Sequence, residues 1–396
     1  MDHVGDRVRR CRLWRGLTQQ QLADLAGWPK SAVSMLETGA RGLDSRARLR
    51  QLAEALRVAP TDLTGEPYPL DAPGLAEAQA GVPAVESALM DARIGDTVAF
   101  DPRSLDQLEA EVHGPLMAAA HNADDAGRIG MLPGLIVELQ AYGREERALR
   151  LLCATCVEAT QGLRMVGQVP LAWIAAERAA EAAGIVGDPV LMAAAEFARA
   201  HARPPAAGGI ARAGQAADRI PDRLVESDRW SQEVYGMLRL TAALAAQVRG
   251  DAAGAAAQAE EAARVAEVHG DCADSWRYFG YFGPANVGVW RVALAVEAGE
   301  PARALEHAAA VDTSTLKRGR RASLLLDTAR AHHQMGRSHE RQAVVALRKA
   351  EQLASVRMHA SPWARDLVEV MLTQSKRESG GRELRGLAYR MGLDAT

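Results

Sequence analysis

Residues 17–39 read LTQQQLADLAGWPKSAVSMLETG and hold two short apolar helical patterns on either side of a glycine. Thr18 stands where the side chain of a helix N-cap accepts a backbone N–H. Gly27 suits the turn between the two patterns, because glycine adopts a positive φ at little cost. The stretch therefore predicts two short helices joined by a tight turn. The apolar positions expected on the inner face of the first helix are Leu22, Leu25 and Ala26.

The segments around this stretch complete a small basic domain. Apolar residues at helical spacing also cover residues 4–15 and 45–58, and a short last turn follows at APTDL. Residues 1–58 contain 11 Lys and Arg against 6 Asp and Glu, whereas the rest of the chain contains 36 basic and 44 acidic residues. A basic head on an acidic body is typical of a polyanion-binding module joined to a second domain. We place this five-helix head at residues 1–66.

Four segments of the head resemble the XRE-type, lambda-repressor-like helix-turn-helix family in their order and spacing. The segments are VGDRVRRCR, LTQQQLADLAG, SAVSMLETG and LRQLAEALRVAPTDL. The resemblance implies that the helix after Gly27 enters the major groove of double-stranded DNA, while the helix before Gly27 braces it across the backbone.

The resemblance also implies which side chains contact DNA. A lysine donates to guanine acceptors and a serine serves either type of base, whereas a methionine can meet only an apolar group such as a thymine methyl. Pro29 leaves the recognition helix without a side-chain cap. Glu37 resembles the structural acid of the family and is expected to pair with an arginine of the first helix. The implied contacts are Gln19, Lys30, Ser31, Ser34 and Met35, with Thr38 and Arg41 on phosphates.

Several functions find no support in the sequence. It contains no nucleophile elbow, zinc-protease motif, phosphate-binding loop or dinucleotide fingerprint, so we expect neither an enzyme nor a cofactor. Cys153 and Cys156 form a C-x-x-C without a second pair, so we expect reduced core thiols, with a redox or metal role as the alternative. No apolar run reaches 18 residues and no signal-like N-terminus is present, so we expect a cytoplasmic protein that does not engage a membrane.

The rest of the chain is rich in alanine, leucine, glutamate and arginine, which favour helices, so the fold class expected is all-α. Scattered prolines and glycines in residues 67–103 predict a linker, and residues 104–396 then form a helical domain.

Helix, glycine turn and helix recur within this domain, with a small residue at a fixed offset after the glycine. Ala148 follows Gly143 in this way, Ala255 follows Gly250, and in a looser form Ala343 follows Gly336. The pattern resembles tetratricopeptide repeats, although intervals of 49 and 37 residues between successive glycines differ from the usual ~34. We therefore expect a degenerate α-solenoid. Further turns of this kind are expected at Gly187 and Gly299.

An aromatic cluster is the candidate ligand groove of this domain. Six of the 17 aromatic residues of the chain lie within residues 276–290. In a groove between stacked helix pairs, an asparagine can bridge a peptide backbone and an arginine can clamp a carboxylate. The same aromatic residues are equally suited to filling an irregular core. The candidate ligand-binding residues are Trp276, Tyr278, Tyr281, Asn286, Trp290 and Arg291.

Together these features predict a sequence-specific DNA-binding transcriptional regulator of actinobacterial type. Its helical-repeat domain would bind a signal, either a peptide or a small molecule, or hold a homodimer whose two heads read two half-sites. Peptide-pheromone receptors of Gram-positive bacteria have a similar architecture. The alternative is a DNA-bound scaffold that recruits a protein partner and binds no small ligand.

Overall fold

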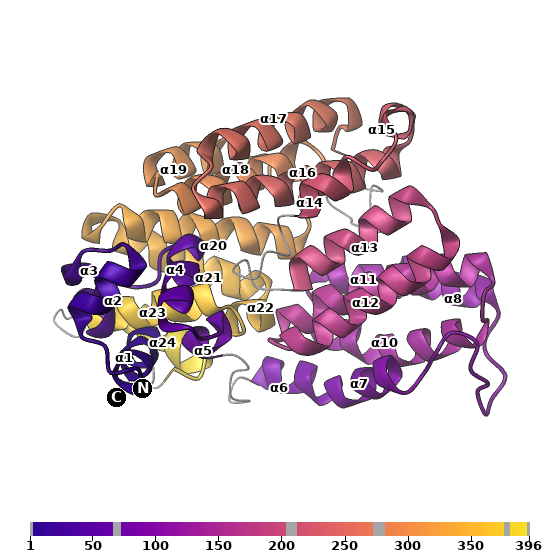
Figure 1. Ribbon diagram of the computed structural model, residues 1–396, viewed down its shortest axis with the longest axis horizontal. Coiled ribbons are helices and arrows are strands. Elements are labelled where there is room, and N and C mark those ends of the chain that lie inside the picture. Colours follow the sequence, from indigo (N-terminus) through magenta and orange to yellow (C-terminus); the bar gives the residue numbers. More distant parts are fainter. Residues whose placement is uncertain (1–2, 66–72, 203–211, 272–281, 376–380, 394–396) are drawn as a thin grey trace.

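The computed structural model describes residues 3–65, 73–202, 212–271, 282–375 and 381–393, and within these ranges every regular element is helical. Residues 3–65 form a head at one end of the molecule, and the residues from 73 onward form a body (Figure 1). The head comprises α1 (Val4–Trp14), α2 (Gln19–Ala26), α3 (Lys30–Glu37), α4 (Arg46–Leu56) and α5 (Pro60–Thr64).

The body continues as a series of helices, most of which pair with their neighbours in the chain. Its first half comprises α6 (Pro73–Ala80), α7 (Val82–Met90), α8 (Leu105–Glu111), a π-helical turn η1 (Val112–Leu116), α9 (Met117–Asn122), α10 (Asp125–Ala141), α11 (Glu146–Met165), α12 (Val169–Val186) and α13 (Pro189–Ala202). Its second half comprises α14 (Arg212–Ala217), α15 (Asp222–Ser227), α16 (Arg229–Arg249), α17 (Ala252–His269), α18 (Pro284–Ala298), α19 (Pro301–Ala310), α20 (Arg318–Gln334), a 3₁₀ turn η3 (Arg337–His339), α21 (Glu340–Leu353), α22 (Ser355–His359), α23 (Pro362–Ser375) and α24 (Arg382–Arg390).

The local signals of the opening stretch operate as predicted in the head. Thr18 caps α2 in a reciprocal arrangement with Gln21, and Gly27 ends α2 in the left-handed region at φ 69°. Pro29 precedes α3 without any side-chain cap. Leu22 and Ala26 are buried as expected, but Leu25 is 58% exposed, because the inner face of this short helix is narrower than its apolar residues suggest.

A buried ion pair ties α3 to α1. Arg12 Nε donates to Glu37 Oε1 at 2.6 Å and Nη2 donates to Glu37 Oε2 at 3.0 Å. Both residues are buried. The expected partnership of Glu37 with an arginine of the first helix is therefore confirmed, and Arg12 is a structural residue of the head.

The predicted turns of the body are confirmed. All five glycines expected at these turns have positive φ, namely Gly143, Gly187, Gly250, Gly299 and Gly336. The small residues that follow four of them are fully or almost fully buried, so neighbouring helices approach closely there: Ala148, Ala255, Ala304 and Ala343.

The body also folds back on itself. Arg357 in α22 forms an ion pair with Asp125 at the start of α10, with Nε 2.9 Å from Oδ2, across 232 positions of the chain. α22 packs against α6 of the first half of the body, while α23 and α24 lie alongside the head (Figure 1).

The segment expected to be a linker is in part helical. Residues 73–90 form α6 and α7, and Leu75, Val85 and Leu89 are buried in the same core as α10. Pro73 and Pro83 stand in the first turns of the two helices, where the missing N–H costs nothing. These two prolines therefore begin helices and do not mark irregular structure, whereas residues 91–103 lack helix.

The C-x-x-C pair lies inside α11. Cys153 and Cys156 are buried free thiols, and burial raises the pKa of both well above the usual range of a cysteine. The raised pKa keeps both side chains in the thiol form, whereas the thiolate is the reactive form. The two cysteines therefore serve as core residues of α11. Within the described ranges no group of His, Cys, Asp and Glu could hold a metal ion, and no helix there has the length and apolar character needed to span a membrane.

Candidate nucleic-acid interface

The outward face of α3 remains accessible in the whole molecule. Lys30, Ser31, Met35 and Thr38 are exposed, and Ser34 is half-buried. Met35 is 45% exposed to solvent even though the body packs beside the head. The structure therefore brings five of the seven predicted DNA contacts together on one open face.

The two remaining predicted contacts are already engaged within the head. Gln19 is half-buried, and its Nε2 donates to Glu37 Oε2 at 2.9 Å. Arg41 is half-buried, and its Nη2 donates to Asp44 Oδ2 at 2.8 Å. The Gln19 contact orients this side chain beside α3, whereas Arg41 would have to leave Asp44 to reach a phosphate.

The loop after α3, residues 38–45, is docked on the body, and its backbone atoms meet side chains of two body helices, α20 and α23. The amide of Leu43 donates to Asp366 Oδ2 in α23 at 2.7 Å, and the carbonyl of Asp44 accepts from Arg330 Nη2 in α20 at 3.0 Å. The carbonyl of Ala40 accepts from Gln374 at 3.2 Å. These contacts fix the orientation of the head on the body.

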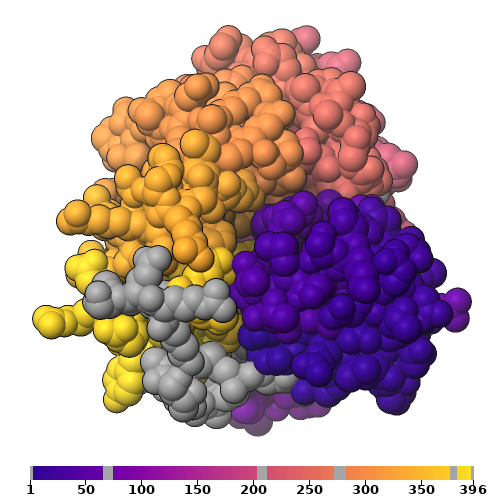
Figure 2. Space-filling view, turned by 90° about the vertical axis from the view of Figure 1, so that its left-hand side faces the viewer, coloured from indigo at the N-terminus to yellow at the C-terminus, as the bar shows by residue number. Residues whose placement is uncertain are grey.

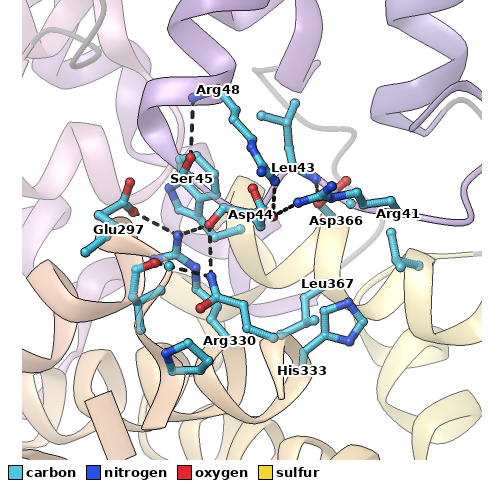
Figure 3. Close-up of a pocket in the computed structure, with 18 of the residues that line it drawn as sticks. Arg41, Leu43, Asp44, Ser45, Arg48, Glu297, Arg330, His333, Asp366 and Leu367 are labelled. Atoms are coloured by element: carbon cyan, nitrogen blue, oxygen red, sulfur yellow. Dashed lines mark hydrogen bonds and ion pairs between the residues drawn. The ribbon is translucent and has the colours of Figure 1, made fainter. Parts of the chain in front are cut away.

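A buried charge cluster lies at the centre of this junction (Figure 3). Arg330 Nη2 of α20 donates to Glu297 of α18 at 2.8 Å, as Figure 3 shows. Arg46 Nη1 of the head also donates to Glu297, at 2.6 Å. The two guanidinium groups also lie over the ring of Trp363, at 5.1 and 4.9 Å from its centroid. Burial alone would raise the pKa of Glu297, but the two arginines outweigh it and hold that pKa below its usual range.

A cleft of about 550 Å³ opens between the head and the body at this cluster. Arg41 and Arg48 both donate to the same oxygen of Asp44, while its other oxygen is buried without a partner. Apolar side chains from both sides complete the wall, among them Met35, Leu43, Val296 and Leu367. Met35 and Arg41 thus belong both to the predicted DNA contacts and to this cleft.

Two carboxyl groups of α23 at the junction have raised pKa values. Burial raises the pKa of Asp366 to about 6, although the amide of Leu43 opposes this rise. Burial and the neighbouring Asp366 raise the pKa of Glu369 to about 7. Both carboxyl groups therefore keep their proton up to a higher pH than an exposed carboxyl group does.

The candidate ligand residues of the body do not form a single described site. Asn286 is 2% exposed in the core, where it donates to Met237 and accepts from Arg320 Nε at 2.9 Å. Trp290 is buried in the same region, whereas Arg291 is half-buried and pairs with Glu260 at 3.5 Å. The other three candidates lie outside the described residues, namely Trp276, Tyr278 and Tyr281.

The sequence analysis missed the docking residues altogether. Asp366 and Glu297 stand within apparent body helices, where an acidic side chain ordinarily faces water. An acidic residue on an otherwise apolar helix face was the signal that could have indicated a buried role for Glu297 and Asp366. No local pattern of residues indicates that their partners lie in or near the loop after α3.

Comparison with known proteins supports the assignment of the head. Residues 3–64 match the family model of the helix-turn-helix domain. The HTH-type transcriptional repressor RghR of Bacillus subtilis is 38% identical over 58 residues, which is 15% of this chain and 43% of that protein. No solved structure matches the chain. The head is therefore a helix-turn-helix domain, and the body has no counterpart in these matches.

Proposed function

We propose that this protein is a sequence-specific DNA-binding transcriptional regulator. The supporting observation is that the outward face of α3 stays exposed although the head is firmly docked on the body. A body that only stored the head would be expected to cover this face. The likeness of the head to a transcriptional repressor supports the same function.

The body in this proposal binds a signal, a peptide or small molecule, or holds two chains together as a homodimer. Two heads on two half-sites would multiply the modest affinity of one head. The cleft at the junction supports a regulatory role, since its lining includes Met35 and Arg41 of the head. The alternative is a scaffold that recruits a protein partner to DNA and binds no small ligand.

Two measurements separate these possibilities. Sedimentation of the full chain on operator DNA is expected to give two copies of the 42.3 kDa chain per site. A signal-binding body is expected to show a higher melting temperature with a fraction of native small-molecule extract, because a ligand of the folded state stabilises it by mass action. One copy per site would contradict the dimer, and an unchanged melting temperature across all fractions would favour the scaffold.

Replacing Lys30 with alanine is expected to weaken binding to the operator about tenfold, because a lysine at the start of the recognition helix donates to base edges. The operator is first obtained by selecting bound genomic fragments with the full-length protein. Titration of labelled duplex then measures the affinity for the operator and for a random sequence.

The random duplex should lose much less affinity than the operator in this experiment. Lys349→Ala, which removes an exposed lysine of α21, is the matched control and should change neither value. Equal losses on both duplexes would show that Lys30 contacts only phosphates.

A further inference from the structure

The head cannot reorient on the body without breaking buried contacts. Its loop after α3 is hydrogen-bonded to α20 and α23, and Arg46 at the start of α4 is paired with Glu297 of α18. The partners on the body are all buried side chains, namely Glu297, Arg330 and Asp366. A DNA duplex that binds α3 therefore meets the neighbouring surface of the body in a defined position.

That neighbouring surface is the turn between α20 and α21. A hollow of about 440 Å³ is lined by Met35, Thr38 and Ala40 of the head together with Gly336 and Arg337 of this turn. The turn thus stands beside the C-terminal end of the recognition helix. Figure 2, which looks onto the side of the molecule that carries the head, shows the orange-gold part of the body next to the indigo head.

The turn is exposed and basic. Residues 336–341 read GRSHER, in which Arg337 and Arg341 are exposed and Glu340 is the only acid. Because Thr38 and Met35 also remain exposed, the turn lies next to the recognition face and does not cover it.

We propose that the α20–α21 turn of the body contacts the DNA backbone and extends the interface beyond the head. The inference rests on the proposed function. A recognition helix in the major groove has a phosphate strand along each side, and the residues at the end of that helix lie against one of them. The strand that passes Thr38 continues past Arg337, where a guanidinium can donate two N–H groups to a phosphate. Such a contact adds affinity without reading sequence.

The test is to replace Arg337 with alanine in the full-length protein and to titrate both operator and random duplex over a series of salt concentrations. Affinity is expected to fall several-fold and by the same factor on both duplexes. The slope of log affinity against log salt is expected to drop by about 0.9, which corresponds to one released counterion. The Arg337→Glu variant should lose more affinity because it repels the same phosphate.

Arg348→Ala is the control, since Arg348 lies on α21 and donates to Glu383 of α24. Unchanged affinity and slope in Arg337→Ala would overturn the inference, and so would tighter binding, which would mean that the turn obstructs DNA. If Lys30→Ala still lowers operator affinity in that case, the proposed function stands and only the extended interface fails. If the wild-type protein binds no duplex at all, the proposed function itself fails.

Discussion

Replacing Glu297 with alanine is expected to lower the free energy of unfolding by about 3–5 kcal/mol, because it removes the buried carboxylate that pairs with both the buried Arg330 and the half-buried Arg46. Arg330 would keep Asp327 at 2.8 Å and the carbonyl of Asp44, and Arg46 would lose both contacts with the Glu297 carboxylate. The cluster joins α18, α20 and the head, so the loss should destabilise the junction first.

Chemical denaturation of the full-length variant, followed by tryptophan fluorescence, measures this change, since both guanidinium groups lie over the ring of Trp363. The matched control is Glu300→Ala, a nearby glutamate whose pair with Arg303 is exposed at the surface. An exposed ion pair contributes about 0–1 kcal/mol to the free energy of unfolding, so the unfolding free energy of the control should barely differ from that of the wild type. A loss of less than 1 kcal/mol for Glu297→Ala would contradict the structure, because it would mean that water reaches the cluster.

Replacing Glu369 with glutamine is expected to stabilise the protein at alkaline pH, with an advantage over the wild type that grows by about 2 kcal/mol between pH 5 and pH 8. The pKa of Glu369 rises from 4.5 in the unfolded chain to about 7 in the folded protein. Between these values the folded state binds more protons than the unfolded state, so stability falls as the pH rises. Glutamine carries no charge and avoids this loss.

The charged groups that act on Glu369 are Asp366 and Arg365 of the same helix and Asp6 and Arg7 of the head. The measurement is the difference in unfolding free energy between variant and wild type at each pH. The variant is compared with the wild type at each pH because other groups also change stability with pH. Burial lowers the pKa of histidines such as His121, and such groups make stability rise with pH. The exposed Glu86→Gln serves as control. A constant difference across the pH range would contradict the raised pKa.

Much of the head and of the helical layout could be predicted from the sequence. The cap at Thr18, the turn at Gly27 and the pairing of Glu37 depend on residues within the head, and most of these determinants are a few positions apart. In the body, the left-handed turn at Gly250 and the buried Ala255 follow from the same short-range rules. Short-range rules also explain the error at residues 73–90, since the prolines there suit a first helical turn as well as a loop.

The sequence by itself determined the all-α class, the helix-turn-helix head and the outward face of α3, because helix caps, glycine turns and apolar periodicity act over one or two helical turns. Only the tertiary structure decided where the head sits and which charges are buried. Leu43 and its acceptor Asp366 are 323 positions apart, and Arg46 and Glu297 are 251 positions apart. The burial of such charges depends on which distant helices exclude water from them, and no local pattern of residues carries that information.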